Sequence, residues 1–96
     1  MPKGYILAEL TISDWAAFRP YRDQAGATVE AYGGRFLVRG GDPALIEDDE
    51  AAGLIVVLEF ESPERAMEWY NSPGYQAILP IRLDNATTRL VRATGM

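Results

Sequence analysis

The order of strand-like and helix-like segments is the feature of this 96-residue sequence that most restricts its fold. Residues 54–61, LIVVLEFE, form an apolar run that predicts a buried strand, and residues 4–12 have the same character. Residues 35–39 alternate with a period of two, and residues 87–95 are predicted to be the last strand. Helical patterns follow the first and third of these segments, so the predicted order is β-α-β-β-α-β.

The first helical segment has a recognisable start, apolar stripe and end. Ser13 or Asp14 can act as its N-cap. The apolar side chains recur at spacings of three and four and so share one helix face; they are Phe18, Tyr21, Ala25, Val29 and Tyr32. Pro20 lies inside this pattern and predicts a kink, or a short first turn before the main helix. Gly33 or Gly34 is expected to end the helix in a left-handed conformation.

The second helical region contains two starts marked by proline. Ser62 and Pro63 predict the N-cap and first position of a helix over PERAMEWYN. Residues 72–80 contain a Pro/Gly break, for which we expect a short helical turn, and Pro80 is expected to start another. The acidic segment 44–53, which joins the two middle strands, is predicted to be an exposed hairpin connection.

This order of elements predicts a single α+β domain over residues 1–96, the ferredoxin-like βαββαβ sandwich. Its antiparallel sheet has the strand order 4-1-3-2, and the helices cover one face. Alternation along the strands assigns side chains to the two faces. Those expected to face the helices are Ile6, Ala8, Leu10, Phe36, Val38, Leu54, Val56, Leu58 and Phe60. Those expected to face away are Tyr5, Leu7, Glu9, Arg35, Leu37, Arg39, Ile55, Val57 and Glu59.

The face turned away from the helices is too apolar for open water, because it carries Leu7, Leu37, Ile55 and Val57. A contiguous apolar patch of this kind usually marks an interface. A short chain also buries a small share of its surface, and dimerisation is a common remedy. We therefore expect a homodimer in which two sheets pack face to face.

Composition disfavours several classes of function. The net charge is −5 and no basic cluster is visible, so nucleic acid is not an expected partner. The sequence has neither cysteine nor histidine, which removes disulfides, thiolate catalysis and the commonest ligands of transition metals. The acidic run at 47–50 lacks the ligand spacing of a calcium loop, so it is predicted to be solvated and no metal site is expected. No signal peptide or membrane-spanning stretch is apparent, which predicts a cytoplasmic location and no membrane partner.

The segment GGRFLVRGG at 33–41 has the glycines of a phosphate-binding loop but not its context. A dinucleotide fingerprint opens a helix after a strand, whereas these glycines follow a helix and flank a strand. A P-loop also needs Lys-Ser or Lys-Thr after its last glycine, and Asp42 stands there. The glycines are therefore predicted to end the helix and then to break the strand.

The two arginines of this segment carry more information than its glycines. Arg35 and Arg39 are assigned to the face inside the expected dimer, where Arg35 lies near Glu59 on the next strand. Arginine is rarely buried unless it is paired. Either an ion-pair network that includes Glu59 and Glu9 fixes the register or the dimer seam, or an arginine binds a carboxylate ligand.

The segment EWYNSPGYQ brings three aromatic residues close to a chain break. Trp69 is expected in the core against the sheet. Tyr70 and Tyr75 combine apolar rings with polar tips and are candidates for a pocket mouth. Arg82 either caps nearby carbonyl groups or points into the same cleft. Structural roles are the commoner outcome for residues of this kind.

Four segments together resemble a known bacterial family: YGGRFLVRGG, VVLEF, WYNSPGYQ and the IR pair before the last strand. They occur in this order along nearly the whole chain and are similar to the domain of unknown function 1330 family. The resemblance implies a dimeric α/β-barrel of two ferredoxin-like subunits. The superfamily includes small monooxygenases, lactone isomerases and chlorite-dismutase-like proteins. Trp15 and Pro20 depart from the helix formers expected in the first helix.

Two functions of different classes remain open. In the first, the protein is a cofactor-free enzyme of the isomerase or monooxygenase type that acts on a small aromatic or unsaturated acid, by analogy with the superfamily. Its candidate catalytic residues are Glu59 and Arg39, and its candidate ligand-binding residues are Tyr5, Arg35, Trp69, Tyr70, Tyr75 and Arg82. In the second, it is a non-catalytic ligand-binding or accessory homodimer. A raised pKa of Glu59 beside an open pocket favours the first, and a closed Glu59–arginine cluster favours a structural role.

Overall fold

The computed structural model describes residues 2–48 and 53–96 of the chain. Seven elements follow one another as the sequence predicts, except that two helices stand between the last two strands. They are β1 (Gly4–Ile12), α1 (Trp15–Ala31), β2 (Arg35–Gly40), β3 (Leu54–Phe60), α2 (Pro63–Tyr70), α3 (Pro73–Asn85) and β4 (Ala86–Thr94).

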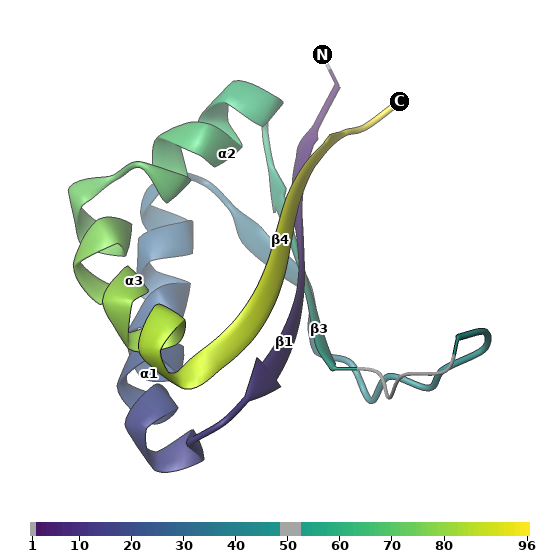
Figure 1. Cartoon of the computed structure of the whole chain (residues 1–96). Helices are drawn as coiled ribbons and strands as arrows, with labels where there is room; N and C mark the ends of the chain where they lie inside the picture. Colours follow the sequence, from purple (N-terminus) through teal and green to yellow (C-terminus); the bar gives the residue numbers. More distant parts are fainter. Residues whose placement is uncertain (1, 49–52) are drawn as a thin grey trace.

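The four strands form one antiparallel sheet in the order β2-β3-β1-β4, which confirms the predicted order. All three helices lie on one face, and Figure 1 shows the other face without a helical layer. Alternation along β1 and β3 places Ile6, Leu58 and Phe60 in the core, each at most 3% exposed. The predicted ferredoxin-like α+β fold is therefore confirmed.

Helix α1 has the predicted apolar stripe and caps, but it continues without a break through Pro20. Phe18, Ala25 and Val29 are buried, and Asp14 is the N-cap, accepting a hydrogen bond from the Ala17 amide at 3.1 Å. The expected separate first turn is absent, because α1 runs unbroken from Trp15 to Ala31 with Pro20 inside it. Burial on both sides of Pro20 outweighs the one helical hydrogen bond that a proline cannot make.

The end of α1 is a glycine-dependent turn. Gly33 has a φ of +73°, the left-handed conformation that glycine adopts at little cost. Its amide donates to the Glu30 carbonyl at 3.0 Å, and the Gly34 amide donates to the Val29 carbonyl at the same distance. This is the Schellman pattern of helix termination, so the predicted C-cap is confirmed.

Two serines start the remaining helices. Ser62 caps α2 with Pro63 in its first turn, as predicted. Ser72 caps α3 through the Tyr75 amide and donates to the Trp69 carbonyl at 2.7 Å. The expected short turns at 72–80 and after Pro80 are wrong, because α3 is a single helix of 13 residues through Pro80. Buried side chains on both sides of Pro80 hold this helix together; they are Tyr75, Ile78, Leu79 and Arg82.

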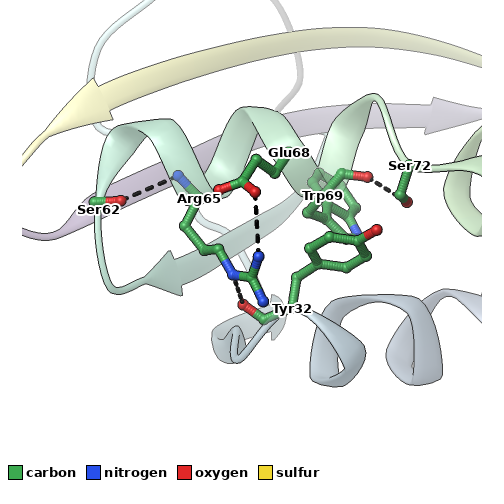
Figure 2. Close-up of polar contacts among 6 residues, drawn as sticks. All are labelled: Tyr32, Ser62, Arg65, Glu68, Trp69 and Ser72. Atoms are coloured by element: carbon green, nitrogen blue, oxygen red, sulfur yellow. Dashed lines mark hydrogen bonds and ion pairs between the residues drawn. The ribbon is translucent and has the colours of Figure 1, made fainter.

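Arg65 on α2 contacts Tyr32 at the end of α1. The Nε atom of Arg65 donates to the Tyr32 carbonyl at 3.1 Å, and its guanidinium lies 4.7 Å from the centre of the Tyr32 ring. Glu68 accepts from the same guanidinium at 3.3 Å (Figure 2). One turn further along α2, Trp69 is 2% exposed in the core, as predicted.

A β-bulge in β2 overturns the predicted side of two residues. Phe36 pairs with Leu58, but Val38 rather than Leu37 pairs with Val57, so Leu37 is the extra residue. Beyond the bulge the alternation is inverted, and Val38 joins Val57 on the face away from the helices. Arg39 pairs with Val56 and turns to the helix side. The prediction that Arg39 shares a face with Arg35 is therefore wrong.

The outer face of the sheet, on the side away from the helices, is apolar and open in the isolated chain. Leu7, Leu37 and Val91 are 41%, 45% and 44% exposed, respectively. Glu47 and Asp48, in the connection between β2 and β3, are exposed as expected, whereas the rest of the acidic run lies outside the described residues. The apolar character predicted for this face is confirmed.

Candidate functional site

A cavity of about 320 Å³ lies between the helix-facing side of the sheet and α1 with α3. Its walls are largely apolar and come from β1, β3, β4 and α1. Small side chains leave space between the layers, among them Ala8 on β1 and Ala25 on α1. The volume falls at the lower end of the range of small-molecule pockets.

Three polar side chains meet at one wall of this cavity. The hydroxyl groups of Tyr21, on α1, and Tyr75, on α3, lie 2.7 Å apart. The Nε atom of Arg82, two turns after Tyr75 on α3, donates to the Tyr75 hydroxyl at 3.3 Å. Burial raises the pKa of Tyr21 far above its ordinary value, with the neighbouring Tyr75 as a second cause, so this phenol remains protonated at neutral pH.

Arg82 is buried without a counter-charge in the part of the chain that the structure describes. Its residue is 5% exposed, and the two ion pairs in that part, Arg35–Glu59 and Arg65–Glu68, do not include it. Buried arginines are normally paired, because an isolated charge is costly to remove from water. An anion in the cavity would supply the missing charge.

The remaining polar residues of the cavity lining also favour an anionic ligand. Thr88, on β4, has a buried hydroxyl that finds no hydrogen-bond partner among the described residues. Arg22 and Arg39 join Arg82 in the lining, whereas no described Asp or Glu does, although the chain carries a net charge of −5. The cavity thus concentrates positive charge in an acidic protein, which favours an anionic ligand.

A separate polar group lies on the outer face. The Arg35 Nε atom and the Glu59 Oε1 atom are 2.9 Å apart, and the Tyr5 hydroxyl donates to Glu59 at 3.1 Å. The hydrogen bond from Arg35 holds the pKa of Glu59 below its ordinary value of 4.5. Glu9 does not join this group, because its carboxylate accepts from the Gly53 amide at 2.9 Å instead.

The candidate residues are therefore divided between the two faces of the sheet. Trp69, Tyr75, Arg82 and Arg39 line the cavity. Tyr5, Arg35 and Glu59 form the hydrogen-bonded group on the outer face. Tyr70 packs against the rings of Trp69 and Tyr75. Tyr75 is fully buried rather than at a pocket mouth, since the Ser72 cap continues directly into α3.

Three lining residues that carry a hydroxyl or guanidinium group were not singled out as site residues from the sequence: Tyr21, Arg22 and Thr88. Tyr21 belongs to the predicted apolar stripe of α1, and a hydroxyl within such a stripe is the one signal that marks it. Arg22 and Thr88 carry no local signal, because their positions depend on how α1 and β4 pack around the cavity.

The structure also limits two other kinds of function. Within residues 2–48 and 53–96, no group of three or more acidic, histidine or cysteine residues is placed to hold a metal ion. In the same part of the chain, none of the helices has the length and hydropathy needed to cross a bilayer.

Solved structures share this fold at low sequence identity. A protein of unknown function from Rhodopseudomonas palustris has 19% identity and a TM-score of 0.81, over 99% of this chain and 83% of that chain. SnoaB, a cofactor-independent oxygenase from Streptomyces nogalater, has 14% identity and a TM-score of 0.66, over 100% and 95%. A dimeric protein of unknown function with a ferredoxin-like fold, from Bacteroides fragilis, has 10% identity and a TM-score of 0.56, over 95% and 94%.

Sequence comparison assigns the family. None of the curated proteins matches the chain. The model of a family described as domain of unknown function (DUF1330) matches residues 3–96, nearly the whole sequence and every element of the sheet and helical layer. The chain therefore belongs to the DUF1330 family.

Proposed function

We propose that the protein binds a small aromatic or unsaturated acid in the cavity between its sheet and helices, and acts on it as a cofactor-free enzyme of the monooxygenase or isomerase type. The observation that carries this proposal is the buried Arg82 guanidinium, which lacks a carboxylate partner among the described residues and contacts a tyrosine pair. Similarity to SnoaB supports the reaction class only as an analogy of fold.

Different residues of the lining would contact different parts of such an acid. Arg82 balances the charge of a carboxylate, or of an enolate formed from it, in a place from which water is largely excluded. Tyr21 and Tyr75 offer hydroxyl hydrogen bonds to an oxygen of the ligand. Trp69 and Phe18 supply aromatic surface for its ring.

A second candidate function is ligand binding without catalysis. The observation that favours it is the lack of Asp and Glu among the described lining residues, which leaves tyrosine as the available proton acceptor. A protonated phenol is a weak base at neutral pH, so proton abstraction from a carbon would be slow. Incubation of bound acids with the protein in air, followed by chromatography, separates turnover from binding alone.

The first test is a binding screen. We expect calorimetry with benzoate, cinnamate and larger aryl acids to detect at least one ligand that raises the melting temperature by mass action. Neutral amides of the same acids should bind at least about tenfold more weakly, because they lack the charge that Arg82 balances. Equal affinity for acids and amides would contradict the proposal.

A matched control distinguishes the cavity from the outer face. Glu59→Gln changes a carboxylate that lies on the opposite side of the sheet, paired with Arg35. This variant should therefore keep the affinity of the wild type for any acid that the screen identifies. A large loss of affinity in Glu59→Gln would move the binding site to the outer face.

We also propose that the chain forms a homodimer through the outer face of its sheet. The group of Tyr5, Arg35 and Glu59 would then lie at the interface between the two subunits. The support is the apolar surface around Leu7, which a second sheet would remove from water.

Leu7→Glu should weaken self-association about 100-fold or more, since it would bury a charge at the interface. Sedimentation equilibrium measures the change, with Leu83→Glu on the helix surface as control. A wild-type monomer at micromolar concentration would exclude the dimer.

A further inference from the structure

A second, polar hollow borders the cavity at the edge of the sheet. This hollow has a volume of about 390 Å³ and is lined by Arg22 and Asp23 of α1 and Arg39 of β2. The two arginines also line the apolar cavity, so the hollow and the cavity meet at these side chains. An anionic group at one end of a ligand in the cavity would therefore lie near two guanidinium groups.

Three separate features determine the position of the Arg39 side chain. The β-bulge at Leu37 turns it from the outer face to the helix side. Its guanidinium then lies 4.4 Å from the centre of the Phe36 ring, and its Nη2 atom donates to the Arg22 carbonyl at 2.9 Å. Bulges are found next to active sites more often than elsewhere because they redirect side chains in this way.

The charges in the hollow do not cancel. Arg22 and Arg39 face one carboxylate, that of Asp23, and none of the three takes part in an ion pair within the described residues. Among the described residues, the Arg39 guanidinium makes one hydrogen bond, to the Arg22 carbonyl. Its other N–H groups are available for planar, bidentate recognition of a carboxylate or phosphate oxygen pair.

We propose that Arg22 and Arg39 form an outer anion subsite, so that the preferred ligand carries an acidic group at each end of an apolar middle. The inner group contacts Arg82 and the outer group contacts the arginine pair. This inference rests on the proposed function, because it extends the same ligand from the cavity to the arginine pair beside it. The chemical class is an aryl or unsaturated diacid, whose outer group is a carboxylate or a phosphate.

The test compares diacids with the matching monoacids. Calorimetry at low ionic strength should be run with terephthalate, 4-carboxycinnamate and biphenyl-4,4′-dicarboxylate, and with benzoate, cinnamate and biphenyl-4-carboxylate. The length series locates the spacing at which both ends are engaged. We expect at least one diacid to bind about tenfold more tightly than its monoacid, and this gain to shrink as salt is added.

Four variants test which residues cause the gain in affinity of the diacid over the monoacid. Arg39→Met should remove the preference for the diacid, measured as the ratio of diacid to monoacid affinity in the same variant, while Arg39→Lys should keep part of it. Asp23→Asn should raise diacid affinity about threefold, because it removes a repelling charge at the subsite. Arg19→Met, which removes an exposed arginine of α1 outside both linings, is the control and should have no effect.

The outcomes separate this inference from the proposed function. Monoacid binding with no diacid preference, or a preference that survives Arg39→Met, overturns the outer subsite and leaves the proposed function standing. If neither monoacids nor diacids bind, the proposed function fails and the outer subsite fails with it. A preference lost in Arg39→Met and kept in Arg19→Met supports the subsite.

Discussion

Replacing Arg82 with methionine should lower the affinity for an acidic ligand about 100-fold or more, because it removes a largely desolvated charge. The same change should leave the stability of the ligand-free protein unchanged or slightly raised. Arg82 is 5% exposed and has no ion-pair partner among the described residues, so its charge is a cost to folding that methionine, of similar length, does not carry. Loss of function with retained or increased stability is typical of a site residue.

Calorimetry with the best acid from the screen measures the first effect, and urea unfolding without ligand measures the second. Arg82→Lys is the matched variant, which keeps the charge but loses the planar guanidinium, so it should bind with intermediate affinity. A variant Arg82→Met that unfolds much more readily and binds acid normally would show that the guanidinium serves the fold.

Replacing Gly34 with alanine should lower the free energy of unfolding by about 3 kcal/mol, the upper part of the range for overpacking a core. A Cβ atom at this position would lie 2.5 Å from a carbon of the Phe60 ring and 2.8 Å from a methyl of Val29. Both neighbours are fully buried at 1% exposure and are held from several sides, so neither side chain has room to move. Chemical unfolding at constant pH measures the change.

Two other glycines provide controls with different physical causes. A Cβ at Gly33 meets nothing within 4 Å, so Gly33→Ala should cost only about 1–2 kcal/mol, for the left-handed backbone. Gly26 lies within α1 and its Cβ would make ordinary contacts at 3.8 Å or more, so Gly26→Ala should stabilise by about 0.5–1 kcal/mol. A smaller loss for Gly34→Ala than for Gly33→Ala would contradict the tight packing between α1 and β3.

Much of the fold followed from local pattern. The helix caps at Asp14, Ser62 and Gly33 and the apolar stripe of α1 all depend on residues close together in the sequence. The strand order followed from the order of elements, since few topologies satisfy it. The interruptions expected at Pro20 and Pro80 were wrong because burial of neighbouring side chains, which local pattern does not report, offsets one missing hydrogen bond.

The candidate site was less predictable than the fold. Trp69, Tyr75 and Arg82 were identified as candidates from one segment and the turn after it, and they do line the cavity. Tyr21 reaches Tyr75 from 54 positions away, and that distance of 2.7 Å depends on how α1 lies against α3. Glu59 and Arg35 were correctly placed as neighbours, but on the face of the sheet opposite the cavity.

The sequence by itself determined the strands, the starts of α1 and α2, the strand order and the apolar character of both faces of the sheet, because each depends on periodicity, on residues near in the chain or on the order of elements. The tertiary structure alone decided which arginine enters the cavity. One extra residue in β2, Leu37, inverts the alternation that follows it, so Arg35 stays on the outer face while Arg39 turns toward α1. The packing of α3 then places Arg82 beside two tyrosines and away from every described carboxylate. Such distances depend on how elements far apart in the sequence pack, and local periodicity does not record them.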